Sequence, residues 1–243
     1  MKLVETLKSL RIYTSHITKP RAAFFDLLVS TAIYELFCNK NALEVGCFTG
    51  ANTLHLANIA KAKNTTVIAL DNWQRPCEEA GCSTDSAVEL FYAHINLVGA
   101  KNHCHFIEKD FNNITIEDIG EVDYVFFDVE FTSTENLLTL FNKIPQPSKF
   151  FFLVDDVRND EKFFKLQEKR RNFNIDNFIE QTSTVEILRS INRSYIAVGY
   201  TDEEIIEFKR ELSEVISFGK HYLNNMWASE KIYYESESNK IKT

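Results

Sequence analysis

The chain has 243 residues, of which 44% are hydrophobic and 26% charged, a composition typical of a globular protein with one full α/β core. The formal net charge is −8, which argues against a nucleic-acid backbone as the main partner because phosphate binding needs clustered Lys and Arg. No stretch reaches the roughly 18 apolar residues of a membrane span, and the N-terminus has no leader pattern, so we expect a cytoplasmic protein without a membrane span.

The first 39 residues are expected to form helices that cover the site. One short helix is predicted over residues 2–12 and a longer one over residues 21–38, beginning just after Pro20. The polar residues 39–41 end the second helix and lead into a strand.

The stretch that organises the chain is residues 42–56. An apolar run over residues 42–45 predicts a buried strand, Gly46 and Gly50 follow in a turn, and helical spacing resumes after Gly50. A strand, a glycine turn and a helix open a nucleotide-binding fold, because glycines allow close ligand approach and a helix start presents N–H groups. The pattern lacks the Gly-x-Gly-x-x-Gly of dinucleotide enzymes and the Gly-Lys-Ser/Thr of a P-loop. Glu44, two residues before the first glycine, adds an acidic side chain to the pattern and makes it more specific than glycine spacing alone.

A second buried strand is predicted over residues 66–70 and ends in Asp71. An acidic side chain about 20 residues after the glycine turn suits a ribose, because one carboxylate accepts hydrogen bonds from two neighbouring hydroxyls. The alternative is that Asp71 caps the next turn. Asn72 and Trp73 follow directly, and the indole ring either flanks the cofactor or packs in the core.

Residues 74–86 are polar and irregular, as lid or substrate-contacting loops often are. A helix is predicted over residues 85–98, and a third strand over residues 104–108. Asp110 and Phe111 follow this strand, where the fold places residues beside an adenine, so that Asp110 would accept from its amine and Phe111 would pack on its ring.

Strands and helices continue to alternate in the second half. The predicted elements are a strand buried on both faces over residues 122–127, a helix over 133–144, a strand over 149–154, a basic helix over 160–173, and an antiparallel hairpin of residues 184–190 and 194–200. From residue 202 the chain is again predicted to be helical.

Acidic residues follow the fourth and fifth strands. Asp128 and Glu130 follow the fourth strand, and Asp155 and Asp156 follow the fifth. Like charges at adjacent strand ends raise one another's pKa unless a cation lies between them. Asp128, Asp155 and Asp156 therefore predict a divalent metal site with oxygen ligands suited to Mg²⁺. The alternative is that one carboxylate contacts the ligand while the others cap helices or pair with Arg158.

Four motifs together resemble the class I S-adenosylmethionine-dependent methyltransferases, and among them the O-methyltransferases of the macrocin and catechol types. The motifs are Leu-Glu-Val-Gly-Cys-Phe-Thr-Gly at 43–50, Asp-Asn-Trp at 71–73, Asp-Tyr-Val-Phe-Phe-Asp at 123–128 and Leu-Val-Asp-Asp-Val at 153–157. The resemblance covers roughly residues 40–200. It implies an α/β fold with a Rossmann-like, seven-stranded, mostly parallel sheet, helices on both faces and a terminal antiparallel hairpin.

The motifs and the resemblance imply S-adenosylmethionine as cofactor and a divalent metal, with Mg²⁺ held by Asp128, Asp155 and Asp156. The predicted cofactor-binding residues are Glu44, Gly46, Phe48, Thr49, Gly50, Asn52, Asp71, Asn72, Trp73, Asp110, Phe111 and Asp128. Where such families carry a basic side chain after the fourth strand, this chain has Phe131. The general base is therefore predicted to be Asp128 or Glu130.

The expected function is metal-assisted O-methylation of a hydroxyl on a sugar, a glycan or a glycosylated small molecule. One alternative is a metal-independent methyltransferase that acts on a phenolic oxygen, a nitrogen or a carboxylate. A second alternative is a non-catalytic module that binds the cofactor or a partner protein. The chain is expected to form one domain, with N-terminal helices over 1–39, a core over 40–201 and a C-terminal helical extension over 202–243 that packs on the core or mediates a homodimer.

Overall fold

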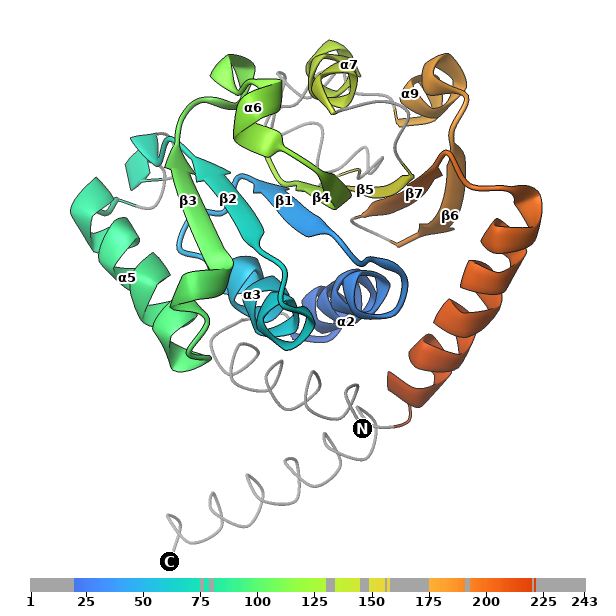
Figure 1. The fold of residues 1–243 in the computed structure, drawn as a ribbon, viewed down its shortest axis with the longest axis horizontal. Helices are drawn as coiled ribbons and strands as arrows, with labels where there is room; N and C mark the ends of the chain where they lie inside the picture. The colour runs from blue at the N-terminus through green and yellow to red at the C-terminus, as the bar shows by residue number, and fades with distance from the viewer. Residues whose placement is uncertain are drawn as a thin grey trace, which may run out of the picture.

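The computed structural model describes residues 20–74, 77–78, 81–129, 134–144, 149–155, 157, 175–190, 193–219 and 221. Seven strands form one sheet in the order β3-β2-β1-β4-β5-β7-β6 (Figure 1). The strands are β1 (Asn41–Val45), β2 (Val67–Asp71), β3 (Cys104–Glu108), β4 (Val122–Phe127), β5 (Phe150–Val154), β6 (Val185–Arg189) and β7 (Ser194–Val198).

The first five strands pair in parallel, whereas β7 pairs antiparallel with both β5 and β6. This confirms the predicted Rossmann-like sheet with a terminal hairpin.

Helices cover both faces of the sheet (Figure 1). One face carries α2 (Pro20–Phe37), α3 (Ala51–Lys63), α5 (Thr84–Leu97) and the helix of residues 202–219; the other carries α6 (Ile116–Ile119), α7 (Thr134–Lys143) and α9 (Ile175–Thr182). Short 3₁₀ helices, η1 (Lys101–His103) and η2 (Phe111–Asn113), flank β3. The helix α9 was not predicted. The predicted helices over 2–12 and 160–173 lie outside the described residues.

Alternate strand residues belong to two hydrophobic clusters, one on each face. Phe151 and Leu153 of β5 pack with residues of α2 and α3, whereas Phe150 and Phe152 pack with residues of α7 and α9. Successive side chains of a strand point to opposite faces, so a strand that is apolar throughout must be covered on both sides. Every residue of β4 and β5 is buried, which confirms that prediction.

The helix of residues 202–219 belongs to the same core. The centroid of the Phe208 ring lies 4.6 Å from that of Phe37 and 5.1 Å from that of Phe151. Ile205 and Leu212 of the same helix are buried in this cluster. The first part of the predicted C-terminal extension therefore packs on the domain, and a homodimer through this region stays a prediction. Among the described helices, none has the length and apolar character that crossing a membrane requires.

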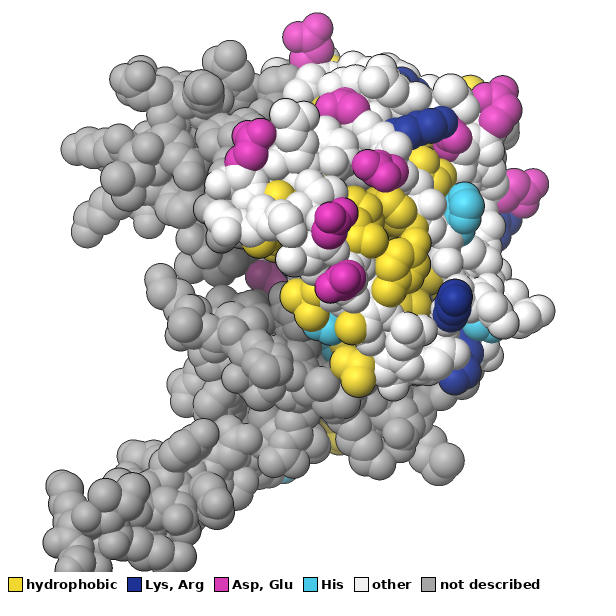
Figure 2. All heavy atoms as spheres, turned by 90° about the vertical axis from the view of Figure 1, so that its left-hand side faces the viewer, with side chains coloured by type: hydrophobic (Ala, Val, Ile, Leu, Met, Phe, Trp, Pro, Cys, Tyr) yellow, Lys and Arg dark blue, Asp and Glu magenta, His cyan; other side chains and the backbone are white. Residues whose placement is uncertain are grey.

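The edge strand β3 and helix α5 form the face shown in Figure 2. Hydrophobic side chains gather in a strip on this face, with Asp and Glu side chains beside it and Lys and Arg in scattered positions. Leu90, Tyr92 and Leu97 of α5 are exposed, as are His105 and Glu108 of β3. Exposed ionisable side chains on an edge strand oppose pairing with another strand.

Candidate functional site

The predicted cofactor-binding residues begin at the carboxyl end of β1. Gly46 has φ +89°, and a Cβ at this position would lie 1.8 Å from the carbonyl oxygen of Asp128, so only glycine fits. The Asp128 N–H donates to the Val45 carbonyl at 2.8 Å. These contacts hold the turn after β1 against the end of β4, and they bring Gly46 and Asp128 side by side.

The turn ends at Gly50, which has φ +77° and is the N-cap of α3. A Cβ on Gly50 would lie 2.6 Å from the Phe91 ring of α5, so the packing of α5 leaves no space for a side chain at this position. Phe48 has φ +42°, and the Thr49 carbonyl lies 2.7 Å from Nδ1 of His94. Gly50 offers no side chain to cap the first N–H groups of α3, and such a helix start is typical of ligand-binding turns.

Asp71, at the end of β2, holds the glycine turn from the neighbouring strand. Its Oδ2 accepts from the Phe48 N–H at 2.7 Å, and its Oδ1 accepts from the Trp73 N–H at 2.8 Å. Burial raises the pKa of Asp71, and these backbone N–H groups lower it. Each carboxylate oxygen has two lone pairs, so acceptor capacity remains for a ribose. The predicted capping role is present in the structure, and ribose binding stays a prediction.

Trp73 lies in the hydrophobic core and is 1% exposed. Its ring stacks on that of Phe106 at 4.1 Å and 17°, and its Nε1 donates to the Phe48 carbonyl at 2.6 Å. Of its two predicted roles, core packing is the one it performs, because a ring this buried has no open face for a ligand. Trp73 supports the glycine turn from within the core.

Asn72 and Asp110 meet across the ends of β2 and β3. The Asn72 Nδ2 donates to Oδ2 of Asp110 at 3.4 Å, and Oδ1 of Asp110 accepts from the Asn112 N–H at 2.8 Å. Phe111 is half-buried and packs edge-on against Phe127 at 5.6 Å. The structure thus brings Asn72 and Asp110 together, and the place of Asp110 and Phe111 beside an adenine stays a prediction.

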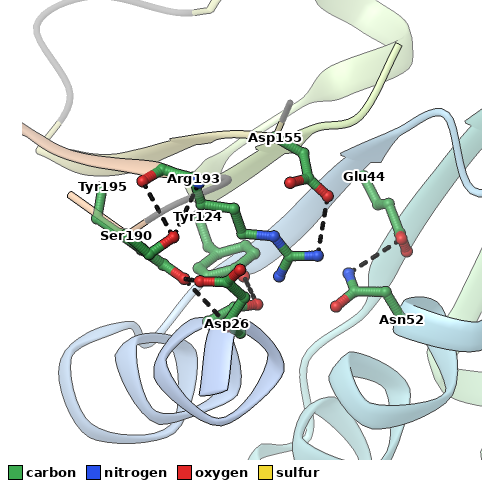
Figure 3. A network of polar contacts seen from close by, with 9 residues as sticks. Asp26, Glu44, Asn52, Tyr124, Asp155, Ser190, Arg193 and Tyr195 are labelled. Carbon is green, nitrogen blue, oxygen red and sulfur yellow. Dashed lines mark hydrogen bonds and ion pairs between the residues drawn. The ribbon is translucent and has the colours of Figure 1, made fainter. Parts of the chain in front are cut away.

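Glu44 and Asn52 form a buried pair on β1 and α3 (Figure 3). Glu44 is 1% exposed, and its Oε1 accepts from the Asn52 Nδ2 at 3.0 Å. The other oxygens, Oε2 of Glu44 and Oδ1 of Asn52, are buried and accept no well-formed hydrogen bond among the described residues, although the buried Thr53 hydroxyl lies close enough to lower the pKa of Glu44. Burial raises the pKa of Glu44 to about 7. Two buried acceptors without donors fit a ligand that brings N–H or O–H groups.

Asp155, at the end of β5, is paired with Arg193. Its Oδ2 accepts from the Arg193 Nη2 at 3.0 Å, with the two side chains 16% and 11% exposed. Because β7 pairs antiparallel with β5, with Ser194 opposite Val154, the residue before β7 lies at the carboxyl edge of the sheet. The guanidinium also lies over the Phe126 ring, with Cζ 4.6 Å from its centroid.

The predicted metal site is not assembled by the residues that the structure describes. Within the described ranges there is no group of three or more His, Cys, Asp and Glu side chains placed to hold a metal ion. Asp155 already has a positive partner in Arg193, which supplies the charge that the prediction assigned to a metal. Asp156, and Glu130 as the second candidate base, lie outside the described residues.

Helix α2 adds a buried carboxyl group that the sequence did not indicate as a site residue. Asp26 is 2% exposed, and its Oδ1 accepts from the Tyr195 hydroxyl at 3.2 Å. Burial raises the pKa of Asp26. The Arg193 N–H donates to the Ser190 Oγ at 2.9 Å, so this network joins α2 to the β6–β7 hairpin (Figure 3). A possible signal was the polar pair Asp26 and Ser30, one turn apart in an otherwise apolar helix.

Comparison with known proteins supports the fold. No family model matches the chain. A carboxy-S-adenosyl-L-methionine synthase from Vibrio vulnificus (strain YJ016) is 29% identical over 106 residues, which are 44% of this chain and 38% of that protein. The chain therefore matches less than half of the length of this curated relative.

Two solved structures superpose over most of the chain. A methyltransferase from Podospora anserina, bound to S-adenosylhomocysteine (SAH), has a TM-score of 0.53 at 12% identity and covers 79% of this chain and 86% of its own. A candidate caffeoyl-CoA O-methyltransferase from Staphylococcus aureus has a TM-score of 0.52 at 11% identity, with 82% and 93% covered. At these identities the likeness shows the fold, a Rossmann-like sheet of seven strands.

Proposed function

We propose that the chain is an S-adenosylmethionine-dependent methyltransferase that methylates a hydroxyl oxygen. The observation that carries the proposal is the pair of buried acceptors, Glu44 Oε2 and Asn52 Oδ1, beside the glycine turn. The ammonium group of a methionine moiety supplies donors of the kind that these oxygens lack. Asp71 keeps acceptor capacity for ribose hydroxyls at the next strand end.

The protein's part in this reaction is mainly alignment and proton removal. A sulfonium cofactor held by Glu44, Asn52 and Asp71 would supply an activated methyl carbon for transfer to the acceptor oxygen, with the thioether as leaving group. Gly46 lets the turn pack against the backbone of Asp128, and Glu44 with Asn52 orients the methionine end of the cofactor. Asp128, held beside Gly46, takes the proton of the acceptor hydroxyl as general base. Glu130 remains the second candidate for this role.

Two further features of the reaction are the identity of the acceptor and the involvement of a metal. A hydroxyl of a sugar, a glycan or a glycosylated small molecule is the proposed acceptor by family resemblance, and a phenolic hydroxyl is the alternative. Metal assistance rests on the same resemblance, whereas the Arg193–Asp155 pair favours the metal-independent alternative. Full activity after treatment with a chelator would exclude metal assistance.

The curated relative favours a second candidate, which is formation or use of carboxy-S-adenosylmethionine. The 106 matched residues are the observation behind it. Mass spectrometry of the ligands released from the purified protein separates the two candidates, because the carboxylated cofactor is heavier than S-adenosylmethionine.

The binding test of the main proposal is calorimetric titration of the protein with SAH, and with NAD as the control ligand. We expect saturable binding of SAH alone. A protein that binds neither SAH nor S-adenosylmethionine contradicts the proposal. Transfer of labelled methyl groups to acceptors then tests catalysis, and D128N protein that keeps full turnover contradicts the role of Asp128.

A further inference from the structure

Arg193 carries hydrogen-bond donors that the contacts described so far do not use. Its Nη2 donates to Asp155, but Nε and Nη1 are buried and have no hydrogen-bond partner among the described residues. The residue is only 9% exposed. A buried N–H group without an acceptor is costly, so such groups in a binding site indicate oxygen atoms that arrive with a ligand.

The strand order places Arg193 on the side of the site away from the adenosine-binding residues. Glu44, Asp71 and Asp110 follow or end strands β1, β2 and β3, whereas Arg193 lies at the β5–β7 end of the same edge. Asp128, the proposed base, follows β4 between the two groups. Figure 3 shows the Arg193 guanidinium extending toward the Glu44–Asn52 pair. Under the proposed function, this order leaves the Arg193 side of Asp128 for the acceptor molecule.

The charges around Arg193 are compatible with an anionic ligand. Although burial disfavours the charged form, the Asp155 carboxylate raises the pKa of Arg193 well above its ordinary value, so the guanidinium stays charged. Asp26 and Glu44 also interact with the Arg193 charge, but burial raises the pKa of both carboxyl groups and so disfavours their anionic forms.

We propose that Arg193 binds a carboxylate group of the acceptor, so that the substrate is a hydroxylated carboxylic acid. This inference rests on the proposed function. A planar guanidinium recognises carboxylate oxygens well because its N–H groups lie in one plane. A neutral amide of the same shape presents an N–H group where the acid presents an oxygen, so Arg193 discriminates between the two. Acidic sugars and phenolic acids share the required chemistry.

The test measures dissociation constants for two acid–amide pairs on the SAH-saturated protein. The pairs are D-glucuronate with D-glucuronamide, and 3,4-dihydroxybenzoate with 3,4-dihydroxybenzamide, which separate the sugar source from the phenolic one. We expect one acid to bind about tenfold or more tightly than its amide. The R193Q variant should lose this preference, and R193K should keep part of it.

Arg189, in the same hairpin, provides the matched control. It pairs with Asp176 and Glu186 at distances of 2.5 and 2.7 Å, away from Asp155, so R189Q should keep the preference for the acid. Because R193Q removes the partner of Asp155, the double variant D155N/R193Q preserves the local charge balance if the single variant does not fold. A preference for the acid that persists in R193Q, or in the folded D155N/R193Q variant, overturns the proposal.

The SAH titration keeps this inference separate from the proposed function. If SAH binds but neither acid binds more tightly than its amide, the role of Arg193 is wrong and the proposed function stands. If SAH does not bind, the proposed function fails, and the same acid–amide comparison on the ligand-free protein still decides whether Arg193 binds a carboxylate.

Discussion

Replacing Glu44 by Gln should change how the stability of the ligand-free protein depends on pH. Glu44 is 1% exposed, and burial raises its pKa from an ordinary 4.5 to about 7. Between these two values the folded protein binds a proton that the unfolded chain has released, so the free energy of unfolding falls as pH rises. The difference between the pKa values corresponds to a loss of about 3 kcal/mol.

The E44Q variant should escape this loss because a glutamine side chain resembles the protonated acid. Near pH 4.5, the ordinary pKa of the group, E44Q and the original protein should have similar stability. Above about pH 7, where Glu44 is ionised, E44Q should be more stable by about 3 kcal/mol. The E44Q variant should bind SAH more weakly than the original protein, because the amide presents an N–H group toward the ammonium group of the ligand.

Urea unfolding at a series of pH values, followed by tryptophan fluorescence, measures the effect. The matched control is E121Q, which removes a carboxyl group that is 83% exposed and pairs with Lys40 at the surface. The E121Q curve should run parallel to that of the original protein. If the E44Q curve is also parallel, Glu44 does not hold a proton in the folded state and our account of its burial is wrong.

Three further substitutions test the rest of the site. The G46A variant should bind SAH poorly and lose well over the roughly 1–2 kcal/mol of a left-handed φ, because its Cβ would meet the Asp128 carbonyl at 1.8 Å. Its control is G120A, where φ is +60° but no atom lies within 4 Å, so only the backbone strain is expected in urea unfolding. The D71N variant should weaken SAH binding about tenfold or more in calorimetry, through lost charge-assisted hydrogen bonds; unchanged affinity would exclude ribose binding. The D128N variant should lower kcat by about 10²–10⁴ with little change in SAH affinity, and an equal loss of both would make Asp128 a binding residue instead of the base.

The strands and the glycine turn were predictable because each depends on neighbouring residues. An apolar run between turn-forming residues predicts a buried strand, and β1 to β5 lie within one residue of their predicted bounds. The helix α9 was missed because it has only 8 residues and its amphipathic pattern spans two turns. Such a short pattern is hard to distinguish from a loop.

The roles of individual side chains were less predictable, because contacts between distant parts of the chain decide them. Trp73 could flank a cofactor or pack in the core, and only its stacking on Phe106 decided between the two. Asp155 read as a metal ligand because a sequence shows the carboxylates at strand ends but not the cations that reach them. The structure pairs Asp155 with Arg193, the residue before β7, and metal binding stays a prediction.

The sequence by itself determined the sheet, the glycine turn and the acidic strand ends, since local pattern and the carboxyl edge of a parallel sheet are sufficient for these features. Tertiary structure alone decided which of the gathered polar groups are satisfied. It joined Asp155 to Arg193 through the antiparallel return of β7, and it left Glu44 with one buried oxygen that accepts no well-formed hydrogen bond among the described residues. Hydrogen bonding and burial depend on atoms that are distant in sequence, and the two oxygens of one carboxyl group can differ in both.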